Sequence, residues 1–252
     1  MRLFKSFIAC FSTYSKIPMP TVDLDSEDMK YVFVFFPIVG VVIGVLEYIS
    51  FILCTNFGLP RFFRACIAVI IPIILTGGIH IDGYMDTKDA LCSYGDKEKK
   101  LAIMKDPHTG GFAIINLIVY MICYIAFMYI VNEKSIMYVC YSYVFSRILS
   151  GISVVTIKSA KANGMLSSVK NNSEQRKVFV VLLVMTAVIS AFLFTIDIRN
   201  TSVFLIISVL GIYIYKRKVL KEFDGITGDT SGYFLCVMEL VFLIAASICG
   251  II

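Results

Sequence analysis

The sequence is poor in charged residues and contains no tryptophan. Only 16% of its 252 residues are charged, whereas 58% are hydrophobic. The mean hydropathy is +0.85. Soluble domains are about 45–50% apolar and about 25% charged, so this composition excludes an ordinary soluble protein and predicts one embedded in a membrane. The missing tryptophan leaves tyrosine alone to supply the aromatic belt at the membrane surface.

The eight cysteines form no C-x-x-C pair, and histidine occurs only twice. Most of the cysteines lie in or beside apolar segments, so the pattern predicts neither a disulfide framework nor a zinc knuckle. We interpret them as small apolar residues in a reducing environment. Both histidines, His80 and His108, lie in one loop at residues 77 to 110. Chemistry is therefore expected in that loop.

Long apolar runs set the fold class. A membrane-crossing helix needs about 20 mostly apolar residues, and the sequence predicts an all-α, polytopic membrane helical bundle of about seven spans. Residues 1 to 20 are predicted to form an interfacial or re-entrant amphipathic helix, because polar residues interrupt the run and no cleavage site follows. Residues 1 to 252 are interpreted as a single membrane-embedded domain without repeats. The expected spans lie at about 30 to 54, 61 to 76, 111 to 131, 135 to 157, 178 to 196, 202 to 215 and 233 to 252.

The distribution of lysine and arginine predicts the orientation. If the N-terminus is cytoplasmic, the inside segments hold most of the basic residues. The positive-inside rule then places residues 1 to 30 and the 77 to 110 loop in the cytoplasm. The net charge of +5 mostly reflects this topology, and it predicts no nucleic-acid partner. The outside connections hold only Arg61, Arg64, Lys134 and Arg199.

The stretch "GGIHIDGYMDTKDAL", residues 77 to 91, carries three aspartates. Read as a helix, it places Asp82, Asp86 and Asp89 at i, i+4 and i+7, on one face and without a local cation. Clustered oxygen ligands favour Mg²⁺, Mn²⁺ or Ca²⁺, and Mg²⁺ is usually held by one or two carboxylates together with substrate phosphates. The alternative is an ordinary solvated acidic face, and the spacing alone does not decide between them.

Two further polar stretches precede predicted spans. "MKDPHTGGF", residues 104 to 112, contains Lys105 and Asp106 before two glycines, where a turn and a helix N-terminus can meet an anion. Taken alone, two glycines before a helix are more commonly only a turn. "DGITGDTSGY", residues 224 to 233, could add the Asp229 carboxylate and hydroxyl donors, or could be a loop with an N-cap.

Three ionisable residues, Glu47, Arg147 and Glu239, fall inside apolar segments. A charge at the centre of a bilayer costs at least about 2.5 kcal/mol, so such groups usually face the protein interior or a watery cavity. Arg147 is therefore expected either to pair with one of the two glutamates or to reach a substrate phosphate.

These motifs resemble the cobalamin synthase family, the adenosylcobinamide-GDP ribazoletransferases. The acidic stretch resembles the family signature G-G-x-H-x-D-G-x-x-D-x-x-D, and "IMKDPHTGGFA" and "TGDTSG" resemble its continuation and tail motif. "FSTYSKIPMP", "FFPIVGVVIGVL" and "AKANGM" resemble its other motifs, with Lys161 where the family has arginine. The resemblance covers nearly the whole chain.

The resemblance implies a Mg²⁺-dependent phosphotransferase in a prokaryotic cell membrane, with its active-site loops in the cytoplasm. Its substrates would be adenosylcobinamide-GDP and α-ribazole or α-ribazole 5′-phosphate, giving adenosylcobalamin or its 5′-phosphate and GMP. This would be the step that assembles the nucleotide loop in cobalamin biosynthesis. The lipid bilayer is a further partner, and a homo-oligomer stays open.

A mechanism built on this resemblance assigns three kinds of role. The carboxylates would bind Mg²⁺, His80 or Asp106 would take the proton of the attacking hydroxyl, and the cations would steady the departing GMP. The metal ligands would be Asp82, Asp86, Asp89 and Asp229; the catalytic residues His80, Asp106 and Lys105; and the substrate-binding residues Arg147, Lys161, His108 and Thr227.

Two other functions fit part of the pattern. A CDP-alcohol phosphotransferase also uses aspartates between spans, but position 86 is aspartate where its Ala-Arg pair would come, and the final spacing is two residues rather than three. A divalent-cation transporter could also collect carboxylates, yet transport sites usually lie near the bilayer midplane. The acidic cluster instead follows the end of a predicted span.

Overall fold

The computed structural model describes residues 2–160 and 165–250 as a helical protein. Within these ranges the only extended pairing is an isolated bridge between Ser159 and Ile226. The elements are α1 (Arg2–Tyr14), the 3-10 helix η1 (Ser26–Tyr31), α2 (Val32–Asn56), α3 (Arg61–Thr76), α4 (Ile79–Cys92), α5 (Lys97–Ile103), α6 (Gly111–Ile130), α7 (Ile136–Thr156), α8 (Met165–Asn172), α9 (Gln175–Ile196), α10 (Ile198–Phe223) and α11 (Gly228–Cys249).

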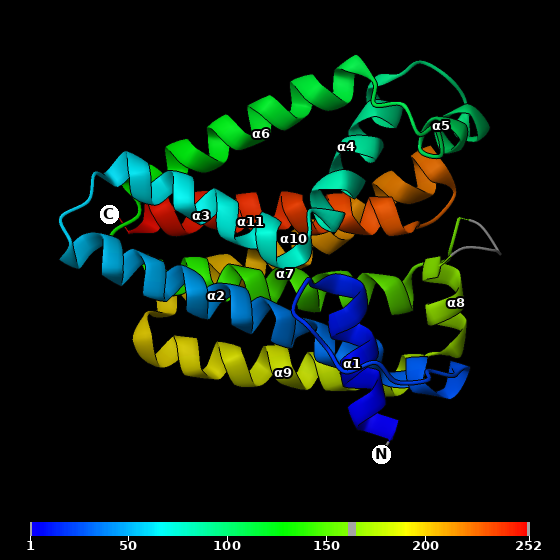
Figure 1. Ribbon diagram of the computed structural model, residues 1–252, viewed down its shortest axis with the longest axis horizontal. Helices are drawn as coiled ribbons and strands as arrows, with labels where there is room; N and C mark the ends of the chain where they lie inside the picture. The colour runs from blue at the N-terminus through cyan, green and yellow to red at the C-terminus, as the bar shows by residue number, and fades with distance from the viewer. Residues whose placement is uncertain (1, 161–164, 251–252) are drawn as a thin grey trace.

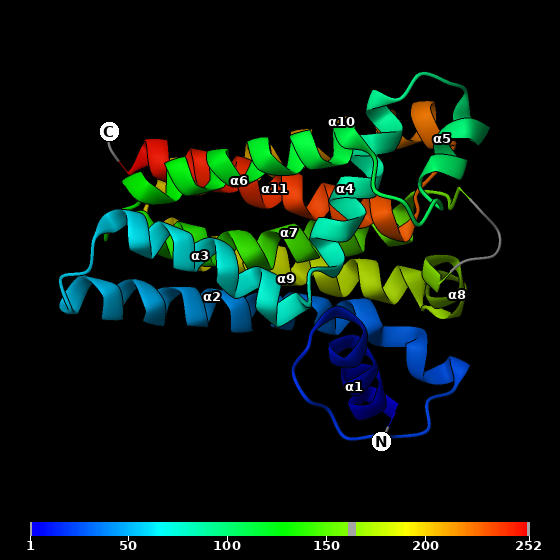
Figure 2. The ribbon, with the colours of Figure 1, turned by 45° about the horizontal axis from the view of Figure 1, so that its top comes forward.

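The long helices run side by side along the long axis of the molecule, and the short ones gather at one end (Figure 1). Helix α7 occupies the centre, where it packs against α2, α9 and α11. The turned view in Figure 2 shows α1 beside the start of α2, and α4, α5 and α8 toward the same end of the bundle, whereas the C-terminus lies at the other end. The polar stretches singled out in the sequence therefore meet at one end.

Five described helices are long and apolar enough to cross a membrane: α2, α6, α7, α9 and α11. The pair α3 and α4 raises this number to six if it is counted as one broken span. The predicted all-α, multi-pass membrane bundle is thus confirmed, but the total of about seven spans is not. Helix α3 occupies residues 61 to 76, as predicted, while α10, predicted as the sixth span, is not among the five.

Two glycines separate the acidic helix from the preceding apolar one. Gly77 and Gly78 adopt positive φ angles of 64° and 77°, which only glycine tolerates readily. Helix α4 consequently leaves α3 at an angle of 97°. If α3 follows the membrane normal, α4 lies along the membrane surface, outside the spanning segments. In that orientation the turn places the three aspartates at the membrane surface.

Glycine also permits a close contact in the bundle core. A Cβ atom added at Gly44 of α2 would lie 2.7 Å from the backbone oxygen of Cys140 in α7. Small residues allow helices in membranes to approach closely, because van der Waals packing replaces the hydrophobic effect as the driving force there. This contact fixes α2 against the central helix and with it one wall of the cavity described below.

Candidate active site

Helices α4 and α11 touch backbone to backbone at two glycines. A Cβ atom at Gly83 would lie 2.8 Å from the backbone oxygen of Asp229, and one at Gly232 would lie 3.1 Å from the backbone oxygen of His80. Real Cβ atoms essentially never approach as closely as the first distance. The two glycines therefore allow the start of α11 to lie directly on α4, and they bring Asp229 to the acidic helix.

The four predicted metal-binding carboxylates influence one another. The pKa of Asp86 is raised from 3.8 to about 6, first by burial and then by the negative charges of Asp82, Asp229 and Asp89. Like charges within a few ångströms disfavour the ionised form. The sequence predicted all four as metal ligands, three of them on one face of α4. The fold brings Asp229, about 140 residues further along, to the other three.

Asp89 lies against the start of α6. Its carboxylate oxygens occupy the space that a Cβ atom would take at Gly110, the N-cap residue of that helix. A helix N-terminus carries partial positive charge from its unpaired N–H groups and favours a nearby anion. The turn in "HTGGF" thus lies against a carboxylate of the protein itself, that of Asp89.

No group of three or more His, Cys, Asp or Glu side chains within residues 2–160 and 165–250 is arranged to hold a metal ion by itself. The carboxylates instead form a loose, mutually repelling group, in which Asp86 resists ionisation. This donor set fits Mg²⁺ in its usual protein setting, where one or two carboxylates bind and substrate phosphates and water complete the octahedron. It does not fit a closed, all-protein cage.

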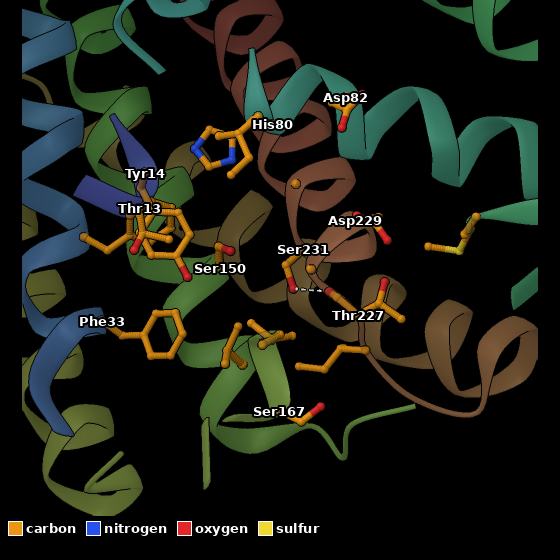
Figure 3. Close-up of a pocket in the computed structure, with 18 of the residues that line it drawn as sticks. Thr13, Tyr14, Phe33, His80, Asp82, Ser150, Ser167, Thr227, Asp229 and Ser231 are labelled. Carbon is orange, nitrogen blue, oxygen red and sulfur yellow. Dashed lines mark hydrogen bonds between the residues drawn. The ribbon is translucent and has the colours of Figure 1, made fainter. Parts of the chain in front are cut away.

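An open cavity of about 360 Å³ lies beside the carboxylates, between α1, α2, α4, α7 and α11. Figure 3 shows His80 and Asp82 from α4 on one side, Asp229 and Ser231 from α11 next to them, and Phe33 from α2 opposite. The described polar side chains in the lining include His80, Asp82, Lys105, Thr227, Asp229 and Ser231. Apolar side chains from α2, α5 and α7 form the remaining wall, so the cavity joins an acidic edge to an apolar interior.

Thr227 is engaged as a helix cap. Its hydroxyl oxygen accepts the backbone N–H of Thr230 at 3.1 Å, while the Thr230 hydroxyl accepts the N–H of Thr227 at 2.8 Å. This capping box satisfies orphan donors at the start of α11. The N-cap alternative for the tail stretch is therefore confirmed, and the same cap places Asp229 in the first turn, on the cavity side.

His80 lines the cavity and is 7% exposed. Its Nε2 atom has no hydrogen-bond partner among the described residues. Its ring lies 6.3 Å from the ring of Tyr14 and 5.8 Å from that of Phe36, centroid to centroid. Burial, followed by the positive charge of Arg147, lowers the pKa of His80 to about 3. The imidazole is therefore neutral at physiological pH and has a free nitrogen.

Several predicted site residues lie elsewhere. The Asp106 carboxylate lies 2.7 Å from Nδ1 of His108, and both side chains are largely exposed and outside the cavity lining. Arg147 is buried and forms an ion pair with Glu239, with 2.6 Å between the nitrogen and oxygen atoms. This is one of the two alternatives expected for it from the sequence. Lys161 lies outside the described residues. Their predicted roles toward substrate stay predictions.

The sequence reasoning missed the contribution of the N-terminal helix. Thr13 and Tyr14 of α1 and Ser150 of α7 line the cavity together with the acidic segments. The stretch "FSTYSKIPMP" contains Thr13 and Tyr14. Its resemblance to a family motif did not indicate that these residues line the site. Its polar residues within an otherwise apolar helix were the available clue.

Stability should fall with rising pH in metal-free protein because of Asp86. Its folded pKa of about 6 exceeds the ordinary 3.8, so the stabilising contribution is complete below about pH 4 and is lost as the pH rises through 6. Asp86→Asn should therefore melt higher than the parent at pH 7.5 and close to it at pH 4. Thermal unfolding in detergent without divalent ions measures this difference.

The exposed Asp23 provides the control, since Asp23→Asn should not change the pH dependence. Addition of Mg²⁺ should raise the melting temperature of the parent more than that of Asp86→Asn. A variant that melts below the parent at pH 7.5 would show that Asp86 is stabilised, rather than strained, by its surroundings.

Fold and site together define a multi-pass helical membrane protein with a carboxylate-edged cavity at one end of its bundle. A family model described as cobalamin-5-phosphate synthase matches residues 6–247, and the chain belongs to this family. No solved structure matches the chain.

Several curated relatives carry the name adenosylcobinamide-GDP ribazoletransferase. The protein from Lachnoclostridium phytofermentans is 36% identical over 241 residues, which cover 96% of this chain and 92% of that protein. The protein from Clostridioides difficile strain 630 is 33% identical over 256 residues, covering 95% and 96%. The protein from Clostridium perfringens strain ATCC 13124 is 30% identical over 251 residues, covering 98% and 100%. The similarity therefore includes every segment that forms the cavity.

Proposed function

We propose that this protein is an adenosylcobinamide-GDP ribazoletransferase that assembles the nucleotide loop in cobalamin biosynthesis. The observation that carries the proposal is the family match over residues 6–247, which contains the whole acidic cavity edge. The relatives of that name match at 30–36% identity over nearly their full length. The resemblance noted from the motifs and the comparisons of the whole chain thus lead to the same activity.

In the proposed reaction the 5′-hydroxyl oxygen of α-ribazole attacks the phosphorus that carries the aminopropanol arm of adenosylcobinamide-GDP. A new oxygen–phosphorus bond forms, and the bond from that phosphorus to the bridging oxygen of the diphosphate breaks. GMP leaves with the bridging oxygen, and the hydroxyl proton is released. Such a transfer depends mainly on alignment of the two oxygens and on compensation of negative charge.

The cavity suits the smaller substrate. Its volume of about 360 Å³ is near the lower end of the roughly 300–1,000 Å³ typical of small-molecule sites. The aromatic side chains of Phe33, Phe36 and Tyr14 can pack against the flat heterocyclic base of α-ribazole. Its 5′-hydroxyl would then reach the acidic edge at Asp82 and Asp229. The bulky corrinoid would stay largely outside, at the membrane surface.

One or two of the four carboxylates would hold Mg²⁺ together with the diphosphate of the other substrate. Asp82 and Asp229 line the cavity, and Asp86 and Asp89 lie close enough to affect the same charge balance. When bound, Mg²⁺ would supply the positive charge that a diphosphate needs in the transition state. Lys105, also in the lining, would add a cation beside the departing GMP.

His80 fits the attacking hydroxyl better than Asp106. His80 lines the cavity, and its Nε2 atom has no hydrogen-bond partner among the described residues, whereas Asp106 is exposed and already bonded to His108. We expect His80→Gln to lower the turnover number about 100-fold, in the range typical of a lost proton acceptor. Asp106→Asn should stay within about fivefold of the parent. Turnover measured from pH 6 to 8 should show no titration of His80.

If Asp106→Asn lowers the turnover number more than His80→Gln does, Asp106 is the proton acceptor and His80 has no part in the mechanism. Folding of each variant can be checked by its melting temperature in the same detergent. Because the variants replace groups of similar size, a difference in turnover without a difference in stability reports on chemistry.

The orientation completes the proposal. Helices α4, α5 and α8, which contribute residues to the cavity lining, lie at one end of the bundle (Figure 1). The sequence places most lysines and arginines in the segments of that end. The positive-inside rule therefore favours a cytoplasmic cavity and a cytoplasmic N-terminus in a prokaryotic cell membrane.

The proposed function is tested by supplying both substrates to purified protein in detergent with Mg²⁺. Formation of adenosylcobalamin and GMP in equal amounts is expected. Equal turnover of a CDP-activated alcohol would favour the CDP-alcohol phosphotransferase alternative. Metal uptake into proteoliposomes without any corrinoid would favour a transporter. Absence of cobalamin product with correctly folded protein would overturn the proposal.

A further inference from the structure

A second cavity lies at the opposite end of the bundle from α4. This groove of about 490 Å³ is formed where α2 ends, α3 begins and the chain turns from α6 to α7. These connections lie at the left end in Figure 1, far from the short helices around the acidic cavity. Its described lining holds three cationic side chains, Arg61, Arg64 and Lys134, and one carboxylate, Glu133.

Arg64 is buried without a negative partner. Its side chain is 8% exposed, and among the described residues it forms no ion pair. Its guanidinium donates to the Thr55 hydroxyl at 3.1 Å and to the Val131 carbonyl at 2.9 Å, while its Nε atom has no partner. Buried charges are usually paired, so this arginine is held in place with its charge uncompensated.

Neutral contacts fix the guanidinium at the groove. Its central carbon lies 4.2 Å from the centre of the Phe51 ring, a cation–π contact that limits its orientation. An arginine held by an aromatic ring and two neutral oxygens is preorganised for a further acceptor, because little side-chain entropy is left to lose.

The surrounding charges increase the preference for an anion. Arg61 and Lys134 are exposed at the groove, and neither forms an ion pair within residues 2–160 and 165–250. Glu133 contributes one negative charge against three positive ones. Guanidinium groups match phosphate oxygens in geometry, and charge-assisted bonds to phosphate are about twice as strong as neutral ones.

The position of the groove favours a lipid phosphate. It lies at the ends of α2 and α6, two of the helices that can cross the membrane, where headgroups are expected. Large apolar side chains next to it are exposed, including Phe57 at 76% and Phe62 at 61%. Such side chains are suited to contact with acyl chains rather than water.

We propose that the groove binds the phosphate of an anionic phospholipid through Arg64, Arg61 and Lys134. The headgroup phosphate would accept hydrogen bonds from the N–H groups of these three side chains that have no other partner among the described residues. The acyl chains would lie along the apolar side chains beside the groove. This site is separate from the acidic cavity and does not depend on the proposed transferase activity. Free phosphate shares the recognised chemistry, so the test must separate the two.

The experiment compares lipid binding by purified protein in detergent and a phosphate-free buffer. Phosphatidylglycerol, diacylglycerol and inorganic phosphate are added separately, and binding is measured by native mass spectrometry and by the shift in melting temperature. Phosphatidylglycerol should bind and raise the melting temperature, whereas diacylglycerol, which lacks the phosphate, should do neither. Inorganic phosphate at the same concentration should have a weaker effect.

Exposed residues allow variants that do not disturb the buried arginine. The double variant Arg61→Gln/Lys134→Gln should bind phosphatidylglycerol about tenfold more weakly, and Glu133→Gln should bind it more tightly. Arg199→Gln, which removes a cation outside the groove lining, is the matched control and should bind like the parent. Equal binding by parent and double variant, or an equal effect of diacylglycerol, would overturn the proposal. An equal effect of inorganic phosphate would overturn the assignment to lipid.

Discussion

Asp82→Asn should lower product formation at least about 1000-fold, because it removes a carboxylate that both lines the cavity and belongs to the acidic cluster. Loss of one preorganised charge-stabilising group typically costs 10²–10³ in turnover, and a weakened Mg²⁺ site adds to this loss. Asparagine keeps the size of the side chain, so the change is mainly one of charge. The measurement is the initial rate of cobalamin formation at saturating Mg²⁺.

Asp229→Asn should behave in the same way, although it lies about 140 residues further along the chain. If both carboxylates serve one ion, the double variant should be scarcely slower than either single one, since groups that act as a unit are not additive. Asp23→Asn, at an exposed position outside the cavity, should retain parental turnover. Activity of Asp82→Asn within about tenfold of the parent would reject the ligand role.

Arg147→Met should lower the free energy of unfolding by about 3–5 kcal/mol, because it leaves Glu239 buried and without its cation. In the structure the two side chains are 1% and 5% exposed and their nitrogen and oxygen atoms lie 2.6 Å apart. The double variant Arg147→Met/Glu239→Met should recover most of the loss, since apolar residues of similar volume replace a buried ion pair at little cost. Unfolding curves recorded in detergent measure the stability of the single and the double variant.

The exposed pair Lys177 and Glu174 is the comparison. Their charged atoms lie 3.6 Å apart with side chains 63% and 39% exposed, so Lys177→Met should cost less than about 1 kcal/mol. If the double variant at Arg147 and Glu239 is as unstable as the single one, the unpaired Glu239 is not the cause of the instability. If Arg147→Met is as stable as the parent but no longer binds substrate, the predicted substrate-binding role of Arg147 is favoured instead.

The apolar pattern predicted the helical architecture well. The start and end of α3, the helical form of the acidic stretch and an N-cap within residues 224 to 233 follow from local patterns. Local patterns succeed here because a helix satisfies its own backbone groups, which is obligatory in lipid. The number of spans is a different matter, since five or six described helices meet the length and composition of a span and the sequence predicted about seven.

The candidate site was only partly predictable. The spacing of the aspartates placed three carboxylates on one face of α4, but it did not indicate that His80 would be buried while Asp106 and His108 would be exposed. Those three residues lie in the same loop and carry similar chemistry. Their different positions result from packing against α1 and α11, which are distant in the sequence.

By itself the sequence determined the membrane class, the extent of most helices and the acidic face, because hydropathy and helical periodicity act over short stretches. Tertiary structure alone decided that Asp229 meets α4, through two glycines that allow backbones to touch. It also decided that α4 turns by 97° away from α3 and that Arg64 is buried with no acidic partner among the described residues. Contacts between distant segments depend on shape and volume at one point in space, and no local pattern records these.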